Sequence, residues 1–190
     1  MTIILTSTLL VALAEIGDKT MLLAIILAAR FRRPLPIIVG IFAATVINHA
    51  LAAWAGSAVA GLLDGVWFRL AVAIGFLAMA AWTLVPDTID DAEGDAISPY
   101  GAFIATTIAF FIAEMGDKTQ IATIALGAQY QSVLLVAIGT TAGMMIANVP
   151  AVFLGERMTT IFPLRLMRIT TAILFAVLGG WALWDLWYSL

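Results

Sequence analysis

The sequence predicts an all-α integral membrane protein whose six transmembrane helices form two inverted three-helix repeats. Three observations support this fold class. The 190-residue chain is 63% hydrophobic and only 11% charged, with a mean hydropathy of +1.08, whereas soluble domains carry roughly 25% charged residues. Its apolar residues form six stretches long enough to cross a bilayer. The second half of the chain repeats the first at a constant spacing.

The six apolar stretches set the predicted spans, because a helix needs about 20 residues to cross the hydrocarbon core. Short connections separate them, such as RFRRPLP at 30–36, where Pro34 and Pro36 should interrupt a helix. The connection at 86–99 holds five acidic and no basic residues, so we expect it to be solvated. The predicted spans are 2–29, 35–56, 66–85, 100–127, 132–154 and 164–188.

One offset relates the two halves. Adding 99 to a residue number in the first half gives its counterpart, so AEIGDKT at 14–20 matches AEMGDKT at 113–119. The same register pairs Trp82 with Trp181. The predicted organisation is a first three-helix repeat at 1–85, an acidic cytoplasmic loop at 86–99 and a second three-helix repeat at 100–190.

Each copy holds three spans, so the second copy should enter the membrane from the opposite face. Inverted repeats of this kind place the substrate site of many secondary transporters at their interface, near the middle of the bilayer. Glu15 and Glu114 fall about halfway along the first span of each copy, at that depth. Ionisable groups there cost roughly 2.5–3.5 kcal/mol each on insertion, so they should face one another or water.

The repeated motif brings charges and a glycine together inside an apolar span. On a continuous helix, Glu15, Asp18 and Lys19 would share one face, because residues three and four apart are neighbours. Gly17 would admit a neighbouring backbone or let the helix unwind locally. Four motif carboxylates and two lysines sum to a charge of −2, which matches one divalent cation or two protons. Crowded carboxylates in a low dielectric also bind protons more readily, as proton coupling requires.

The candidate metal ligands are the motif carboxylates, Glu15, Asp18, Glu114 and Asp117. Hard oxygen donors of this kind suit Ca²⁺, Mn²⁺ and Mg²⁺ better than Zn²⁺ or Cu⁺. Polar residues close to them in the predicted spans are candidates for a supporting role in the site. These residues are Lys19, Thr20, Lys118, Thr119, Gln120, Asn48 and Asn148.

The second span of each copy carries a polar residue at equivalent positions, since His49 corresponds to Asn148. A lone polar residue on an apolar span is more often an interhelical hydrogen-bond partner than a ligand. We favour that role for His49 over contact with the substrate path. Pro150 should free a backbone carbonyl and kink the fifth span. Gly139 and Gly143 are interpreted as a site of close helix packing.

The arginine distribution predicts the orientation in the membrane. One predicted side carries six arginines and the other carries only Arg69, so the arginine-rich side should be cytoplasmic and both termini outside. Aromatic residues near the span ends are candidates for interfacial anchors, with packing inside the bundle as the alternative. The six arginines are Arg30, Arg32, Arg33, Arg157, Arg165 and Arg168, and the aromatic residues are Trp67, Trp82, Tyr100, Tyr130, Trp184, Trp187 and Tyr188.

A purely structural role for the motifs is an alternative to a cation site. Salt bridges between Glu15 and Lys118 and between Glu114 and Lys19 would pin the two halves together. Four carboxylates against two lysines leave unbalanced charge that such salt bridges do not need. We therefore favour the cation site.

These residues resemble the GDT family of cation exchangers, in which Glu-x-Gly-Asp-(Lys/Arg)-(Thr/Ser) occurs on the first span of each three-helix half. Both copies here match at each defined position, and the resemblance covers essentially the whole chain. The family includes Golgi and chloroplast-envelope calcium/manganese transporters and bacterial manganese exporters. The resemblance implies export of Mn²⁺ or Ca²⁺ in exchange for protons, with the motif carboxylates as cation ligands. The metal would be the transported substrate, and no cofactor is expected.

The expected protein is a multi-pass divalent cation/proton antiporter of a prokaryotic inner membrane, working by alternating access. Its expected partners are the divalent ion, protons and the lipid bilayer, with no nucleic acid. An exporter of cationic amino acids with the same six-span architecture is the alternative, since an acidic pocket could hold an ammonium group. A channel would carry ions independently of a pH gradient. An enzyme is not expected, because the sequence lacks a His-Glu-x-x-His zinc motif, a Gly-x-Ser-x-Gly nucleophile elbow and a phosphate-binding loop.

Overall fold

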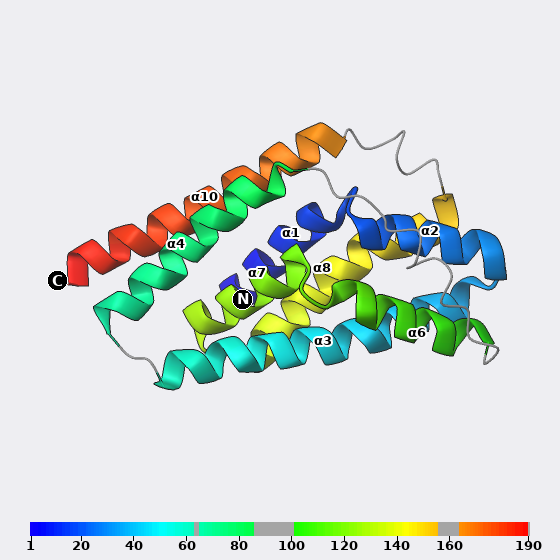
Figure 1. Ribbon diagram of the computed structural model, residues 1–190, viewed down its shortest axis with the longest axis horizontal. Helices are drawn as coiled ribbons and strands as arrows, with labels where there is room; N and C mark the ends of the chain where they lie inside the picture. Colours follow the sequence, from blue (N-terminus) through cyan, green and yellow to red (C-terminus); the bar gives the residue numbers. More distant parts are fainter. Residues whose placement is uncertain (63–64, 86–100, 156–163, 190) are drawn as a thin grey trace.

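The computed structural model is helical throughout the part of the chain that it describes, residues 1–62, 65–85, 101–155 and 164–189 (Figure 1). The predicted acidic loop at 86–99 lies outside these residues, as do Tyr100 and Arg157. In chain order the helices are α1 (Thr2–Glu15), α2 (Lys19–Phe31), α3 (Pro34–Leu62), α4 (Val66–Thr83), α6 (Gly101–Glu114), α7 (Lys118–Tyr130), α8 (Val133–Leu154) and α10 (Leu164–Ser189).

Four of these helices, α3, α4, α8 and α10, are long and apolar enough to cross a membrane, judged by length and composition. By contrast, α1 and α6 are apolar but have only 14 residues each. The predicted spans 2–29 and 100–127 are each divided into two helices, by breaks after Glu15 and after Glu114. The count of six spans stays a prediction. In Figure 1, α1 and α2 still follow one another along the long axis of the molecule, and so do α6 and α7.

Local sequence explains where several helices begin and end. The backbone N–H of Arg32, which has a left-handed φ of 51°, closes α2 by donating to the carbonyl of Ala28. The next helix begins at Pro34, a position where proline fits because its missing N–H is not needed. Pro36 lies in the same first turn. The predicted interruption within 30–36 is confirmed, and it falls between Phe31 and Pro34. Pro150 lies inside α8, which continues to Leu154; the predicted kink there stays a prediction.

Close contacts at small residues hold the first helix of each half against the other half. A Cβ added to Gly139 or Gly143 on α8 would lie within 2.8 Å of a backbone oxygen of α1, which confirms the predicted close packing. The offset counterpart Gly40, on α3, approaches α6 in the same way, with its added Cβ 2.8 Å from the Phe103 carbonyl oxygen. Thus α1 packs on α8 and α6 packs on α3. Because each half contacts the other in this way, the carboxyl-terminal ends of α1 and α6 lie close together.

Apolar side chains fill the interior in two clusters. Met21, Ile41 and Phe110 belong to one cluster, which joins α2, α3 and α6. The other includes Phe76 and Phe175, whose ring centroids lie 6.4 Å apart between α4 and α10. Figure 1 shows α4 and α10 side by side along one side of the molecule.

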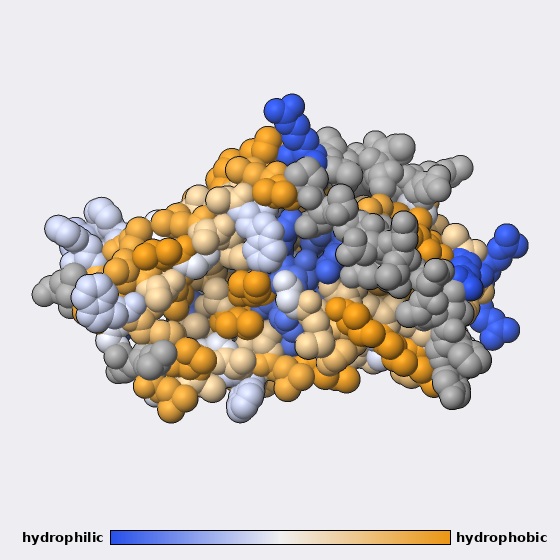
Figure 2. Space-filling model, viewed as in Figure 1, coloured by the Kyte–Doolittle hydropathy of each residue, from blue (hydrophilic) through white to orange (hydrophobic). Residues whose placement is uncertain are grey.

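Hydrophobic residues also cover most of the outside. Figure 2 shows them over most of the visible face, with hydrophilic residues gathered near its centre and toward its ends. A surface of this kind suits a lipid environment. The side chains of Trp67, Trp187 and Tyr188 are more than 70% exposed, as interfacial anchors would be. Trp82 is different, because its ring lies 5.9 Å from Lys118 Nζ.

The described arginines lie at or next to the ends of α2, α4 and α10. The membrane orientation drawn from them stays a prediction. The end of α2, with Arg30, Arg32 and Arg33, lies in the right half of Figure 1. The first turns of α10, with Arg165 and Arg168, lie near the middle of the long axis, whereas the start of α4, with Arg69, lies at the left.

Candidate metal centre

Both copies of the motif lie at a helix break rather than on a helix face. Three residues separate Glu15 at the end of α1 from Lys19 at the start of α2, and the second copy repeats this break between Glu114 and Lys118. The central glycines have left-handed φ values, 90° at Gly17 and 77° at the equivalent position, a conformation that favours glycine. The expectation that Glu15, Asp18 and Lys19 share one helical face is therefore wrong. The alternative effect of Gly17, local unwinding, is confirmed.

Polar side chains of the motif stabilise each break. Asp18 is the N-cap of α2, and its Oδ1 accepts a 2.7 Å hydrogen bond from the Lys19 backbone N–H. Asp117 occupies the N-cap position of α7. Gln120 accepts a 2.7 Å hydrogen bond from the backbone N–H of Gly116, so it holds the connection between α6 and α7 in place.

Three of the four predicted ligands meet in one place. One carboxylate oxygen from each of Glu15, Glu114 and Asp117 lies within 4.8 Å of the other two. We call these three residues the carboxylate cluster. The two glutamates are fully buried and Asp117 is 6% exposed. Asp18 is buried but is not a member of this group.

Matching neighbours surround the two glutamates. Thr20 donates a short hydrogen bond to Glu15 Oε2, and Asn148 Nδ2 donates to the same oxygen at 3.4 Å. Thr119 donates to Glu114 Oε2 at 3.2 Å and lies 3.4 Å from an oxygen of Asp117. The second oxygen of each glutamate, Oε1, is buried without a hydrogen-bond partner among the described residues. These two oxygens are therefore free to bind an ion or a proton.

His49, on α3, lies beside the cluster and meets Glu114 of α6, a contact between helices that is compatible with the role favoured from the sequence. Its Nε2 is 3.5 Å from Glu114 Oε2, and both side chains are fully buried. It occupies beside Glu114 the place that Asn148 occupies beside Glu15. Asn48 points elsewhere, because its Nδ2 donates to the carbonyl of Phe111 at 3.1 Å.

The motif lysines make contacts other than the proposed salt bridges to glutamate. Lys19 Nζ lies 4.0 Å from Asp117 Oδ1, so the cation reaches the aspartate of the other motif. Lys118 Nζ donates to the carbonyl of Val85 at 3.0 Å and lies over the ring of Trp82. Both lysines therefore tie the breaks to neighbouring elements. Neither Val85 nor Trp82 carries a sequence signal for this role.

A small hollow adjoins the breaks. We call it the motif hollow; its lining residues are Ala14, Ile16, Gly17, Asp18, Thr83, Lys118 and Arg168. Because it contains Asp18 and Lys118, it lies directly beside the motifs. Sequence reasoning missed Thr83 and treated Arg168 only as a determinant of orientation. The offset pairs Arg168 with Arg69, which also lines a cavity, but the sequence alone shows neither cavity.

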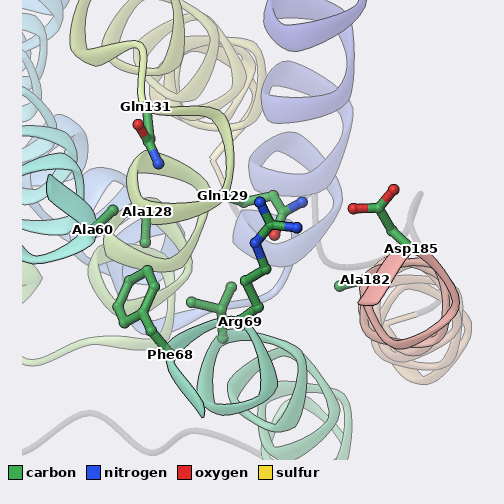
Figure 3. A pocket seen from close by; sticks show the side chains of 9 residues that line it. Ala60, Phe68, Arg69, Ala128, Gln129, Gln131, Ala182 and Asp185 are labelled. Carbon is green, nitrogen blue, oxygen red and sulfur yellow. The ribbon is translucent and has the colours of Figure 1, made fainter. Parts of the chain in front are cut away.

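A second, polar cavity lies at the other end of α7, and we call it the Arg69 pocket. Figure 3 shows the Arg69 guanidinium beside Gln129, with Asp185 on the far side of the same pocket. Gln129 is 11 residues beyond Lys118 on α7, a separation of about 16 Å along the helix. This pocket therefore lies well away from the carboxylate cluster. Asp185 and Gln129 were not singled out from the sequence, because polar residues near span ends are ordinary.

The chemistry open to the cluster follows from its donor set. Three buried carboxylates close together repel one another unless a positive charge joins them. A divalent cation could bind several of their oxygens at once, and hard oxygen donors suit Mn²⁺, Ca²⁺ and Mg²⁺. Protons could neutralise the same oxygens. Metal and protons would therefore compete for one set of atoms.

Comparison with known proteins agrees with this chemistry. The profile of a family described as divalent cation/proton antiporter GDT1 matches residues 3–91 and 102–189. The chain is 51% identical over 180 residues to a Vibrio cholerae protein named "Putative manganese exporter", covering 94% of this chain and 89% of that protein. It is 25% identical over 204 residues to GDT1-like protein 5 of Arabidopsis thaliana, covering 88% of this chain and 89% of the relative. No solved structure matches the chain. The chain therefore belongs to the GDT1 family of divalent cation/proton antiporters.

Proposed function

We propose that this chain exports Mn²⁺ from the cytoplasm in exchange for protons. The observation that carries the proposal is the carboxylate cluster, in which buried oxygens from both motifs lie within 4.8 Å of one another. Membership of a divalent cation/proton antiporter family supports the reaction class. The name of the Vibrio relative supports Mn²⁺ over Ca²⁺ as the exported ion.

Competition for the cluster couples the two ions. When Glu15, Glu114 and Asp117 hold Mn²⁺, their oxygens are occupied and protons are displaced. When protons enter from the opposite side, they neutralise the carboxylates and the metal loses its ligands. Since a charged and empty cluster is costly in a low-dielectric interior, the site crosses between its two states loaded with one ion or the other.

The proposed architecture is a six-span inverted repeat, with repeats at 1–85 and 100–190. The bounds of α6 and α7 equal those of α1 and α2 plus 99, which supports a structural repeat. The exchange of partners between halves, α1 on α8 and α6 on α3, supports a two-fold relation. In this arrangement α1–α2 and α6–α7 are two broken spans whose breaks lie near the bilayer midplane, as in other transporters with discontinuous helices.

Unequal packing of the two halves supports alternating access. The helix α7 contacts α3 and α4, whereas its counterpart α2 contacts α8 and makes no comparable contact with α10 in the described part of the chain. A Cβ added to Gly127 on α7 would lie 2.4 Å from the Ala53 carbonyl oxygen on α3, which shows how tightly these helices meet. We infer that tight packing of α7 closes that end of the molecule. With the arginine-rich end in the cytoplasm, closure there corresponds to an inward-facing state.

An exporter of cationic amino acids, the alternative drawn from the sequence, is not favoured. The family to which the chain belongs exchanges divalent cations for protons. Oxygens that lie within 4.8 Å of one another can also contact a single small ion together.

Transport by purified protein in liposomes tests the proposal. An acidic lumen should drive Mn²⁺ uptake, and the lumen should become more alkaline as protons leave. The same assay with Ca²⁺ and with lysine measures the selectivity. Mn²⁺ flux that does not depend on the pH gradient would indicate a channel. Proton-coupled uptake of lysine instead of metal would support the cationic amino acid exporter.

A further inference from the structure

The two glutamates of the cluster have different nitrogen neighbours. Glu15 accepts from Asn148 Nδ2, an amide nitrogen whose lone pair is not available to a metal. Glu114 instead has the imidazole of His49, whose Nε2 lies 3.5 Å from Glu114 Oε2. His49 is the only histidine of the chain. The carboxylate cluster alone does not account for this difference.

The hydrogen bonding of His49 is incomplete in this conformation. Its side chain is fully buried, yet neither ring nitrogen completes a hydrogen bond within the described residues. Buried polar atoms without partners are unfavourable, and each asks for an explanation.

The spacing between His49 and Glu114 suits two ligands of one ion. Neighbouring ligands in an octahedral shell lie about 3.0–3.5 Å apart when the ion is about 2.1–2.5 Å from each. The observed separation between Nε2 and Oε2 is 3.5 Å. Glu114 Oε1, which has no hydrogen-bond partner among the described residues, supplies a further oxygen at the same place.

We propose that His49 binds the transported cation through Nε2 and thereby sets its selectivity. A site of carboxylates alone suits Mg²⁺, Ca²⁺ and Mn²⁺ alike, whereas an imidazole ligand favours transition-metal ions. One nitrogen among the oxygens therefore favours Mn²⁺ over Ca²⁺ and Mg²⁺. This inference rests on the proposed export of Mn²⁺ by the carboxylate cluster.

The single histidine permits a direct test of ligation. Protein labelled with ¹⁵N-histidine, purified without a histidine tag and loaded with Mn²⁺, should give a ¹⁵N coupling in pulsed electron paramagnetic resonance. The coupling should be absent in His49→Asn. Mn²⁺ that binds, and is lost in Glu114→Gln, but shows no ¹⁵N coupling would overturn the role of His49 and leave the proposed export intact. Failure of the native protein to bind Mn²⁺ would overturn both.

Selectivity is the second measurement, made in liposomes. In His49→Asn the ratio of kcat/KM for Mn²⁺ to that for Ca²⁺ should fall at least about tenfold, since one favourable metal ligand is lost. His49→Gln should shift the ratio in the same direction and guards against misfolding of one variant. Thr45→Val is the matched control, because Thr45 lies one turn earlier on α3 and its buried hydroxyl also lacks a partner in the described structure. An unchanged ratio in both His49 variants would contradict the proposal.

Discussion

Single residues show that the two motifs are alike in sequence but not in position. Glu15 and Glu114 both enter the carboxylate cluster, yet only one of the two aspartates, Asp117, joins them. Asp18 caps α2 and lines the motif hollow instead. If each half adopts the conformation of the other during transport, Asp18 enters the carboxylate cluster and Asp117 takes the position outside it. Asp117 is then the third ligand in the state seen here, and Asp18 takes that role in the opposite state.

Replacing each aspartate by asparagine separates these roles. Asparagine caps a helix about as well as aspartate, so both variants should fold. Asp117→Asn should weaken Mn²⁺ binding at least about tenfold, because an ionised ligand is lost, whereas Asp18→Asn should weaken it much less. The measurement is a Mn²⁺ titration followed by electron paramagnetic resonance. Equal losses of affinity in the two variants would contradict the assignment of Asp117 as the third ligand.

Sequence alone could identify the acidic residues of the site but not all of their neighbours. Glutamate and aspartate inside an apolar span are unusual and are visible in the sequence. His49 gives no such signal, because the sequence does not show which neighbouring helix a single histidine on a long apolar helix faces. Its proposed role depends on α3 lying against α6, which places the imidazole beside Glu114.

The break in each motif helix is the decisive feature at the scale of elements. It leaves the carbonyl ends of α1 and α6 and the N–H ends of α2 and α7 inside the molecule. The backbone N–H of Asp18 donates to the Glu15 carbonyl at 3.0 Å and that of Asp117 to the Glu114 carbonyl at 3.2 Å, so a tight turn closes each break. The breaks give the chain a place to bend.

Glycine at the break should be required for its backbone conformation. Gly116→Ala places a side chain at a φ of 77°, although an added Cβ would meet no atom within 4 Å. The expected loss of stability is about 1–2 kcal/mol, from backbone strain alone. Gly75→Ala is the control, since Gly75 lies inside α4, also meets no atom within 4 Å and has no left-handed φ.

Thermal unfolding in detergent, together with Mn²⁺ transport, measures this effect. Gly116→Ala should lower both the melting temperature and the transport rate, while Gly75→Ala should leave the protein equally or more stable. The requirement for the break would be refuted by a Gly116→Ala protein that matches the native one in both measurements. The sequence left this point open, because Gly17 and Gly116 were equally consistent with close helix packing in an unbroken span.

At the scale of the whole molecule, the two halves repeat one another in sequence but differ in how α2 and α7 pack. The offset of 99 could be read from the sequence, and the helix bounds follow it closely. The difference in packing between α7 and α2 could not be read from the sequence, because both helices begin with the same motif. Small residues at the crossing with α3 distinguish them: Gly127 on α7 corresponds to Ala28 on α2. That difference is too slight to predict which end is closed.

Small substitutions at the α3–α7 crossing should open the end of the molecule that we propose to be closed. A Cβ on Gly56 would lie 1.9 Å from the Ile124 carbonyl oxygen, so Gly56→Ala forces the two helices apart. The chain has no cysteine, so one reporter, Thr123→Cys on the buried face of α7, can be labelled alone. A membrane-impermeant maleimide applied from the outside should label the reporter faster in Gly56→Ala than in the native background.

Two further variants complete this experiment. Gly127→Ala should act like Gly56→Ala, because its added Cβ would meet the Ala53 backbone. Gly61→Ala is the control, since Gly61 also lies on α3 but an added Cβ meets nothing within 4 Å. Labelling of the reporter at one rate in all four backgrounds would argue against closure of the outer end at this crossing.

The central claim is that two motifs, 99 residues apart, make one shared cation site rather than two. The stoichiometry of Mn²⁺ binding to the purified protein tests it most directly, by titration with detection of free Mn²⁺. The account predicts one Mn²⁺ per native chain, and loss of that ion in Glu15→Gln and in Glu114→Gln alike. Two ions per native chain, with one ion retained by each single variant, would contradict it.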